Sequence, residues 1–372
     1  TIRHVVIPLS MPGILSAAIL VFTRALEEFA IPGILGTPSG IYTITTYIFY
    51  QAISYTPPRY EIAAMLATFI MAVTGFGLAL QARILSGKQQ FTTVAGKGQQ
   101  PRPMRLGKWR YATLAYALVY IFLAVILPYA VLIYAAFIDR WGNAPVPAHL
   151  TLHNFAETFS PDLNVQSGFR NSLILAVSGA TIASILALLV SYVIVKRPNW
   201  FGQALEFITI IPMTMPGPVL AVAMLWAYLN PPLVLYGTLW ILLFAYVTHY
   251  IPYGVRTITG SFRQLSAEFE RAAAICGATP TRGFTDIMLP LVRSGVLAGW
   301  MLMFVSMIRE LSASIFLFVP GTETISVSLV EMWQEARFTS VAVLSLSVVA
   351  VSLTVIVIVR YFFGGSSVRA GQ

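Results

Sequence analysis

The chain has 372 residues, of which 57% are hydrophobic and only 10% are charged, whereas soluble domains carry about 25% charged residues. This composition excludes a soluble globular domain and predicts an all-α polytopic membrane protein, because several apolar stretches reach the roughly 20 residues that a helix needs to cross a bilayer. The net charge of +9 does not indicate nucleic-acid binding, since the basic residues lie in short loops beside apolar segments, where they set membrane orientation.

Eight apolar segments follow one another along the chain. They are residues 14–35, 62–82, 111–138, 171–195, 204–229, 233–255, 295–318 and 339–362. Pro212, Pro216, Gly217 and Pro218 interrupt the fifth segment, where proline removes backbone donors and kinks a helix. Broken backbone at membrane depth is tolerated only against protein or a wet cavity. These four residues therefore predict a gate or kink, with simple packing as the alternative.

Charge in the loops predicts the orientation of the chain. Residues 83–110 contain seven basic residues and no acidic residue, so the positive-inside bias places this stretch in the cytoplasm. Counting outward from it puts the loop between Arg256 and Arg293 on the cytoplasmic side. The loops at residues 139–162 and 323–335, which contain acidic residues, then lie outside, so the topology is self-consistent.

A shift of 282 residues lays the start of the chain on its last third without a gap. The matched pairs include Pro8 with Pro290, Gly13 with Gly295, Glu28 with Glu310, and Pro38 with Pro320. Shared apolar composition explains matched leucines, but it does not explain prolines, a glycine and a membrane glutamate in register. The sequence therefore predicts an internal duplication.

The duplication predicts the domain organisation. Residues 1–86 are the end of a first repeat with two transmembrane helices, residues 87–110 are a basic cytoplasmic linker, and residues 111–372 are a second repeat with six helices. In this register Thr1 corresponds to Gly283, so the first copy has lost its early helices. We expect eight transmembrane helices in this N-truncated chain and twelve in the intact protein.

A polar run at residues 263–292 lies between strongly apolar segments, where a membrane protein would carry a docking element for a soluble partner. Leu265, Phe269 and Ala273 recur at helical spacing, and Gly277 suits a left-handed helix cap. Thr279 then supplies an N-cap before Pro280, and a second short helix follows until Pro290 marks entry to the membrane segment. The run predicts a helix-turn-helix at the cytoplasmic surface.

This run resembles the cytoplasmic loop of the permease subunits of ABC importers, which has the pattern E-A-A, three residues, G, nine residues, I-x-L-P. The resemblance extends over the whole chain and implies the type I ABC importer permease fold. In the family, the loop fits a groove on the ATPase subunit and transmits its closure to the membrane helices. Arg271 stands at the usual glutamate position, which leaves open whether Glu270 or Glu268 makes the contact. The residues that the resemblance assigns to ATPase coupling are Glu268, Glu270, Arg271, Ala272, Ala273, Gly277, Ile287, Leu289 and Pro290.

The resemblance also implies a function and partners. Fused permeases of this kind are similar to those of ferric iron importers, with thiamine, polyamine and phosphonate importers as relatives. The implied partners are two copies of an ABC ATPase, a periplasmic solute-binding protein and the lipid bilayer of a bacterial inner membrane. The chain has no G-x-x-x-x-G-K-[ST] run, so ATP and Mg belong to the ATPase and the chain itself is a transport subunit without enzyme activity or cofactor.

Charged residues occur in two membrane segments, where charge is unfavourable. They are Arg24, Glu27 and Glu28 in the first copy, and Arg309 and Glu310 in the second. On a continuous helix, Glu310 lies 15 residues after Gly295, about 22 Å along the axis. Such groups usually face a bundle interior or a pathway, so all five predict a translocation pathway, with a structural pair between Arg24 and Glu28 as the alternative.

Several remaining residues predict no further site. His249, Tyr250 and Tyr253 are interpreted as packing or interface residues. The single cysteine, Cys276, excludes an internal disulfide, and no Cys/His spacing predicts a metal site. An ion-gradient-driven secondary transporter that uses Glu28 and Glu310 is the alternative function. A membrane enzyme has no support, because no nucleophile motif or His/Asp/Glu constellation occurs.

Overall fold

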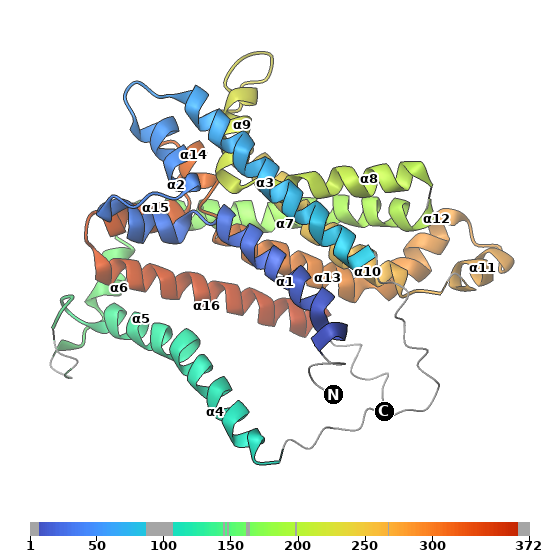
Figure 1. The fold of residues 1–372 in the computed structure, drawn as a ribbon, viewed down its shortest axis with the longest axis horizontal. Coiled ribbons are helices and arrows are strands. Elements are labelled where there is room, and N and C mark those ends of the chain that lie inside the picture. The colour runs from blue at the N-terminus through green and yellow to red at the C-terminus, as the bar shows by residue number, and fades with distance from the viewer. Residues whose placement is uncertain are drawn as a thin grey trace. The chain divides into compact units, whose positions relative to one another are not determined.

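The computed structural model of the chain describes residues 7–86, 107–143, 146, 149–160, 164–197, 199–266 and 268–363. Throughout these residues the regular structure is helical (Figure 1). Apart from the helices, the described residues contain an isolated antiparallel bridge between Ile138 and Leu150. Of the predicted linker, 87–110, only residues 107–110 lie within the described part.

The helices divide the chain as follows. The first half contains α1 (Ile7–Glu27), η2 (Pro32–Gly36), η3 (Thr37–Ser39), α2 (Ile44–Phe49), η4 (Tyr50–Ser54), α3 (Tyr60–Ser86), α4 (Trp109–Ile121), η6 (Phe122–Ile126), α5 (Leu127–Phe137), α6 (His153–Thr158) and α7 (Val165–Lys196). The second half contains α8 (Trp200–Ile210), η9 (Ile211–Thr214), α9 (Gly217–Tyr228), α10 (Leu239–Arg263), α11 (Glu268–Ile275), α12 (Pro280–Arg282), η10 (Gly283–Met288), α13 (Leu289–Ile308), α14 (Ser314–Leu317), α15 (Ile325–Gln334) and α16 (Phe338–Phe363).

Five helical stretches of the described residues are long and apolar enough to cross a membrane. They are Tyr60–Gln81, Trp109–Phe137, Val165–Lys196, Pro280–Ile308 and Phe338–Tyr361. The pair Trp200–Thr214 and Gly217–Tyr228, which bends by 103°, makes a sixth if it counts as one broken span. Each of the eight predicted segments overlaps a helix, but the structure does not confirm a count of eight spans.

Three predicted segment boundaries are wrong. The segment predicted at 14–35 is interrupted after Glu27, and the one predicted at 295–318 is interrupted after Ile308. The segment predicted to start at 233 begins at Leu239, because Gly237 takes a φ of +85° and the Thr238 hydroxyl then accepts from the Trp240 N–H at 3.3 Å. The N-cap, rather than apolar character, fixes this helix start.

The chain forms two compact units. The larger one contains residues 26–74, 160–331 and 347–372, and the smaller one contains residues 1–25, 75–159 and 332–346. In the larger unit, α7, α10 and α13 lie side by side around buried Leu175, Leu242, Tyr246, Met303 and Met307 (Figure 1).

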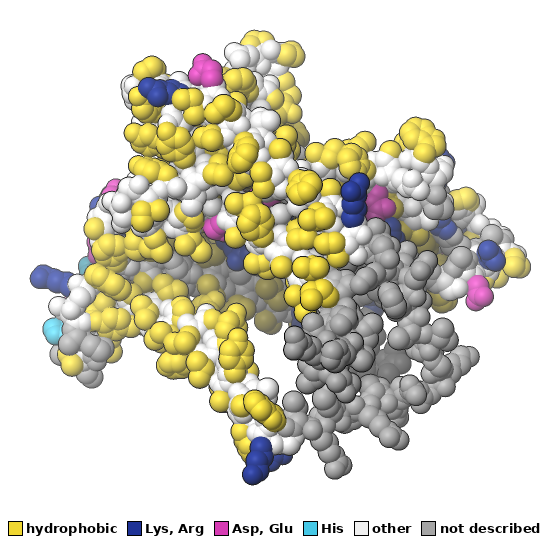
Figure 2. Space-filling view, in the orientation of Figure 1, with side chains coloured by type: hydrophobic (Ala, Val, Ile, Leu, Met, Phe, Trp, Pro, Cys, Tyr) yellow, Lys and Arg dark blue, Asp and Glu magenta, His cyan; other side chains and the backbone are white. Residues whose placement is uncertain are grey.

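The smaller unit has its own small core. Ala135 and Ala136 of α5 pack with Ala342 and Val343 of α16. The Asn154 side chain donates to the carbonyl oxygens of Ala136 at 3.0 Å and Ile138 at 2.7 Å, which holds α6 at the end of α5. Exposed apolar side chains run along α4 and α5 (Figure 2). This stretch therefore has the surface of a helix that faces lipid or other helices.

The predicted duplication has a counterpart in the order of the helices. A shift of 282 residues places α1 on α13, η2 on α14, α2 on α15 and α3 on α16. The first of these pairs starts in register, since Ile7 corresponds to Leu289. The two stretches thus have the same sequence of long helix, break, short helices and long helix.

Candidate functional site

The polar helix pair begins with α11, which ends in a glycine turn. Gly277 has a φ of +81°, and the Ala278 N–H donates to the Ala273 carbonyl at 3.0 Å. A Cβ at Gly277 would meet nothing within 4 Å, so this position requires glycine for its left-handed backbone and not for space.

The second part of the pair differs from the prediction. The Thr279 hydroxyl accepts from the Arg282 N–H at 3.4 Å and starts the helix, as an N-cap does. The helix then continues without a break from Pro280 to Ile308, so Pro290 does not end it. The π-helical turn η10, Gly283–Met288, lies directly before α13 and places Pro290 near its start.

One face of the helix pair is anchored to the membrane helices. Ala273 and Met288 are buried, and the Phe284 ring lies 4.8 Å from the Tyr192 ring of α7. Met288 belongs to an apolar cluster with Phe262 of α10 and Val292 of α13. The helix pair is therefore packed against three long helices, α7, α10 and α13.

The other face of the helix pair is exposed and partly apolar. Ile275 is 86% exposed, and Phe269 is 49% exposed, beside exposed Cys276. Among the residues predicted for coupling, Glu268, Arg271, Ala272, Gly277 and Pro290 are exposed, Ile287 and Leu289 are half-buried, and Ala273 is buried. The side chain of Glu270 lies outside the described residues. Most of the described residues predicted for coupling are therefore exposed to solvent.

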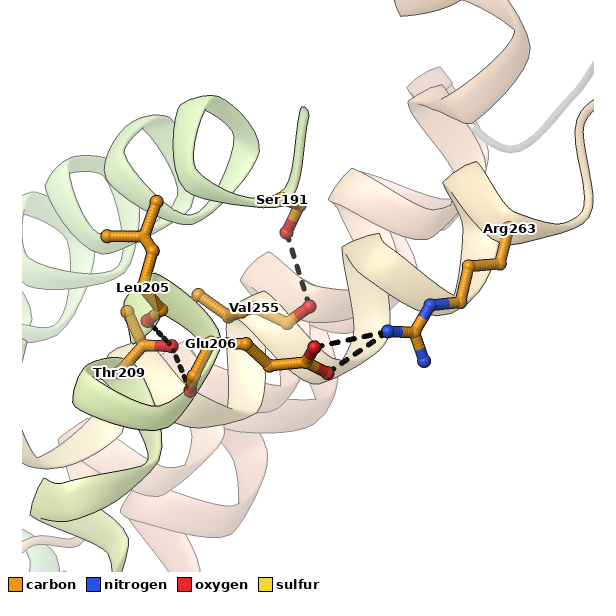
Figure 3. Close-up of polar contacts among 6 residues, drawn as sticks. All are labelled: Ser191, Leu205, Glu206, Thr209, Val255 and Arg263. Atoms are coloured by element: carbon orange, nitrogen blue, oxygen red, sulfur yellow. Dashed lines mark hydrogen bonds and ion pairs between the residues drawn. The ribbon is translucent and has the colours of Figure 1, made fainter. Parts of the chain in front are cut away.

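The helix α10 approaches both α13 and α7 closely. A Cβ at Gly295 of α13 would lie 1.9 Å from the Ser261 hydroxyl of α10. On the other side of α10, the Ser191 hydroxyl of α7 donates to the Val255 carbonyl at 3.2 Å (Figure 3). Such small-residue contacts bring helix backbones close together in membranes.

An ion pair links α8 to the cytoplasmic end predicted for α10. Arg263 donates to both carboxylate oxygens of Glu206, at 3.1 and 3.3 Å (Figure 3). Both side chains are exposed, at 60% for Arg263 and 39% for Glu206, so solvent screens much of this attraction. The pair positions the two helix ends but adds little stability.

A second group of predicted residues lies at the break between α13 and α14. Glu310 follows the end of α13 and is buried, at 8% exposed, whereas the neighbouring Arg309 is exposed. The Tyr250 hydroxyl of α10 donates to Glu310 Oε2, and the Ala313 N–H donates to Oε1 at 2.9 Å. Glu310 is therefore not on a continuous helix, and Tyr250 is more than a packing residue.

Two hydroxyl groups extend the hydrogen bonds at this break to α10. The Ser314 hydroxyl donates to the Glu310 carbonyl at 2.9 Å, and its oxygen lies 2.6 Å from the hydroxyl oxygen of buried Tyr246. No local sequence signal predicts these contacts, because Tyr246 and Ser314 are 68 positions apart.

The first copy repeats one feature of this break. The Glu28 carboxylate accepts from the N–H groups of Ala30 at 3.0 Å and Ile31 at 3.4 Å, and Ile31 corresponds to Ala313. In both copies the glutamate therefore accepts the N–H three residues later. Glu28 differs in being exposed, while Arg24 and Glu27 are half-buried.

The bent pair α8 and α9 lies against the second break. Pro216, Gly217 and Pro218 are buried and Pro212 is half-buried. A Cβ at Gly217 would lie 2.6 Å from Cβ of Ser312. The Thr214 carbonyl accepts from the Thr74 hydroxyl of α3 at 2.8 Å. The predicted kink residues and the Glu310 break are thus in direct contact.

Aromatic rings join the break after Glu27 to the break after Ile308. Phe29, next to Glu28, lies 6.2 Å from Phe316, and Phe49 of α2 lies 5.1 Å from the same ring. Since Phe29 and Phe316 are both buried, the break of the first copy packs directly on the break of the second.

A row of tyrosines was not predicted as a site. Tyr42, Tyr47, Tyr50 and Tyr55 contact one another, with ring centroids 5.5 to 6.2 Å apart along the row. The Arg59 guanidinium lies 3.9 Å from the Tyr55 ring centroid. Tyr42 and Tyr47 are exposed. Their close spacing in sequence was the available signal, and we call these four residues the tyrosine row.

Comparison with known proteins places these features in a family. The family model of the binding-protein-dependent transport system inner membrane component matches residues 179–365. Those residues include α10, the polar helix pair and the Glu310 break. The matched region is thus the part of the chain that carries most of the predicted site.

The chain is similar to two curated permeases. It is 22% identical to the ferric transport system permease protein FbpB of Actinobacillus pleuropneumoniae, over 100% of this chain and 53% of that protein. It is 25% identical to the Fe(3+)-transport system permease protein FbpB 2 of Haemophilus influenzae, over 98% of this chain and 68% of that protein. The chain spans about half the length of the first curated relatives it matches, at 50% and 53%.

A solved structure shares the fold. The bacterial ABC transporter involved in the import of the acidic polysaccharide alginate matches with a TM-score of 0.57 at 15% identity, over 69% of this chain and 96% of that chain. With several helices of spanning length, the chain is a multi-pass protein of the bacterial inner membrane. Its sequence and helices together show that the chain belongs to the family of binding-protein-dependent transport system inner membrane components.

Proposed function

We propose that the chain is the membrane-spanning permease of an ATP-binding-cassette importer, coupled to a separate ATPase through the polar helix pair. The observation that carries this proposal is the arrangement of that pair. It presents Phe269 and Ile275 on an exposed face, while Ala273 and Met288 are packed into the membrane bundle. A helix with this division binds a soluble partner on one face and passes movement inward through the other.

Two ATPase subunits require two such loops. The shared order of helices supports a duplicated permease, with repeats at 1–86 and 111–372 joined by the basic linker 87–110. In this arrangement Arg3–Pro8, which correspond to Thr285–Pro290, are the end of the first copy's loop, and the second copy supplies α11 and η10. The ATPases lie on the cytoplasmic side and hold ATP and Mg.

A periplasmic solute-binding protein is the proposed partner on the other side. The tyrosine row supports this, because tyrosine and arginine dominate the energetics of protein interfaces. In the 282-residue register, its four positions correspond to Thr324, Leu329, Met332 and Arg337, so the second copy has no such row. An interface on one copy suits a single asymmetric binding protein.

The proposed cargo is ferric iron. The curated relatives named above are ferric transport permeases, which supports this choice over thiamine, polyamine or phosphonate. The charged and polar residues at the two breaks, including Glu28 and Glu310, are the proposed pathway, and the bend at Pro212–Pro218 is the proposed gate.

Reconstitution tests the function. The permease is assembled with its ATPase and binding protein in proteoliposomes, and ferric iron uptake is measured with ATP, without ATP, and with a proton gradient alone. We expect uptake only with ATP. Uptake that persists without ATP but stops when the gradient is collapsed would identify a secondary transporter instead.

The coupling role has its own variant. Gly277→Pro removes the left-handed turn, because proline cannot adopt a positive φ. We expect ATP hydrolysis to continue while uptake stops, with Cys276→Ser as a control that keeps both. Normal coupled uptake by Gly277→Pro would refute the assignment of the helix pair.

A further inference from the structure

The Glu310 carboxylate is buried at the break between α13 and α14 with only neutral hydrogen-bond donors around it. Among the described residues, its partners are the Tyr250 hydroxyl and the Ala313 N–H. Arg309, its neighbour in sequence, is exposed. Within the described part of the chain no ion pair joins this carboxylate to a basic side chain, and a buried carboxylate without such a pair is unfavourable in the membrane interior. A bound cation would therefore stabilise the Glu310 carboxylate.

Apart from the Ala313 N–H, the polar groups that the structure places at this carboxylate are oxygen atoms. Tyr250 contacts it directly, and Tyr246 is linked to its backbone through Ser314. Carboxylate, phenol and hydroxyl oxygens suit hard cations, and tyrosine also serves as a ligand to iron in proteins. The described residues contain no group of three or more His, Cys, Asp or Glu that could hold a metal ion. A group built on Tyr250 and Tyr246 would not be counted there, because tyrosine is not one of those four residue types.

The backbone around these oxygens is interrupted. α13 ends at Ile308, and Ser312 packs against Gly217 at the 103° bend between α8 and α9. Interrupted backbone at membrane depth is found where it is buried in protein or lines a cavity. Two interruptions in contact offer a place where small helix movements open the carboxylate to the pathway.

We propose that Glu310, Tyr250 and Tyr246 form a transient binding site for the cargo, a ferric ion in transit. This inference rests on the proposed function, because a neutral or anionic cargo would not use an anionic oxygen site. When the ion binds, the Tyr250 phenol loses its proton to water, and the phenolate and a Glu310 oxygen coordinate the iron. Iron keeps its oxidation state, and return of the proton releases it.

The test uses the colour of the iron–tyrosinate bond. The permease, assembled with its ATPase in lipid nanodiscs, is titrated with ferric citrate, both at rest and with ATP and vanadate. We expect a visible charge-transfer band in at least one state. Its absence from both states would overturn the inference.

Substitutions test whether the charge-transfer band comes from Tyr250. Tyr250→Phe removes the phenol that would bind iron, so the band should disappear. Tyr228→Phe is the matched control, since Tyr228 lies on α9 with its ring 6.3 Å from that of Phe244, and it should keep the band. If Tyr250→Phe does not fold, Tyr246→Phe carries the test and should weaken the band. A band that survives both substitutions would overturn the inference.

Affinity separates binding from a structural role. In Glu310→Gln, we expect the apparent KM for ferric iron uptake to rise about tenfold, the scale seen when groups that support a metal site are removed. A lower thermal stability with an unchanged KM would assign Glu310 a structural role and overturn the inference.

The result also distinguishes this inference from the proposed function. If the wild-type transporter imports ferric iron with ATP but gives no band, the site is wrong and the function stands. If it imports no ferric iron, the proposed cargo is wrong, and an iron band at Tyr250 would then be adventitious binding, so both proposals fail together.

Discussion

At the scale of single residues, two glycines of the helix pair illustrate different requirements. Gly277 has a φ of +81°, whereas Gly283 has a helical φ of −57°. A Cβ would meet nothing within 4 Å at either position. Space is therefore equal at the two sites, and only the backbone conformation distinguishes them.

This difference predicts the effect of adding one methyl group. Gly277→Ala should destabilise the turn by about 1–2 kcal/mol, because a Cβ is unfavourable in the left-handed region. Hydrogen exchange of the Ala278 amide, which donates to Ala273, measures it. Gly283→Ala should leave this exchange unchanged, since alanine favours a helix. Equal acceleration in both variants would contradict the explanation.

The contact between Tyr250 and Glu310 carries a second prediction at this scale. Tyr250→Phe keeps the ring but leaves Glu310 Oε2 without its donor. An unsatisfied buried acceptor costs about 1–3 kcal/mol, and more if it is charged. Thermal unfolding of the purified protein should show this loss. Tyr192→Phe is the control, because the contact of that ring with Phe284 does not need its hydroxyl.

At the scale of helices, the close approach of α10 and α13 depends on Gly295. Its missing Cβ leaves room for Ser261, which lies one position after Gly260 on α10. Gly260 has nothing within 4 Å of where its Cβ would be. The two glycines therefore differ in packing although both are helical.

Substitution by alanine should separate them. Gly295→Ala should destabilise the protein by about 1–3 kcal/mol, the usual cost of overpacking. Gly260→Ala should be neutral or slightly stabilising. Thermal unfolding in detergent gives both values, and Ser261→Gly should restore part of the loss in Gly295→Ala. Failure of that rescue would mean that the two positions do not interact.

The sequence predicted helices better than it predicted where they end. Apolar segments reveal long helices, and Gly277, Thr279 and Pro280 gave the turn of the polar pair from local chemistry alone. The break after Ile308 was missed, because it is held by a bond from Tyr250, 60 positions away in sequence. Pro290 does lie in the first turn of α13, but the helix before it runs on into α13 through a π turn, which no local signal predicted.

At the scale of the whole molecule, the two predicted copies share an order of helices but differ in their surface residues. The tyrosine row occurs in the first copy, and the buried glutamate with its tyrosine partner occurs in the second. The duplication was predicted from prolines, a glycine and a glutamate matched in one register, and the order of the helices supports it. The differences were not, because each depends on contacts between distant segments.

The single cysteine tests the predicted orientation. Cys276 is exposed on the polar helix pair, so a membrane-impermeant maleimide should label it in inside-out vesicles and not in intact spheroplasts. Added ATPase should protect it. In a Cys276→Ser background, Ser54→Cys beside the tyrosine row should show the reverse pattern. Labelling of both positions from the same side would refute the topology.

The π-helical turn before α13 has a consequence for movement along that helix. A π turn holds one residue more than an α turn, and one residue corresponds to about 100° of rotation and 1.5 Å of rise in an α-helix. If Gly283–Met288 rewinds to α geometry, the helix beyond it rotates while the polar pair keeps its place. The residues at the far end of α13, just before Glu310, would then face different neighbours without any hinge within the membrane.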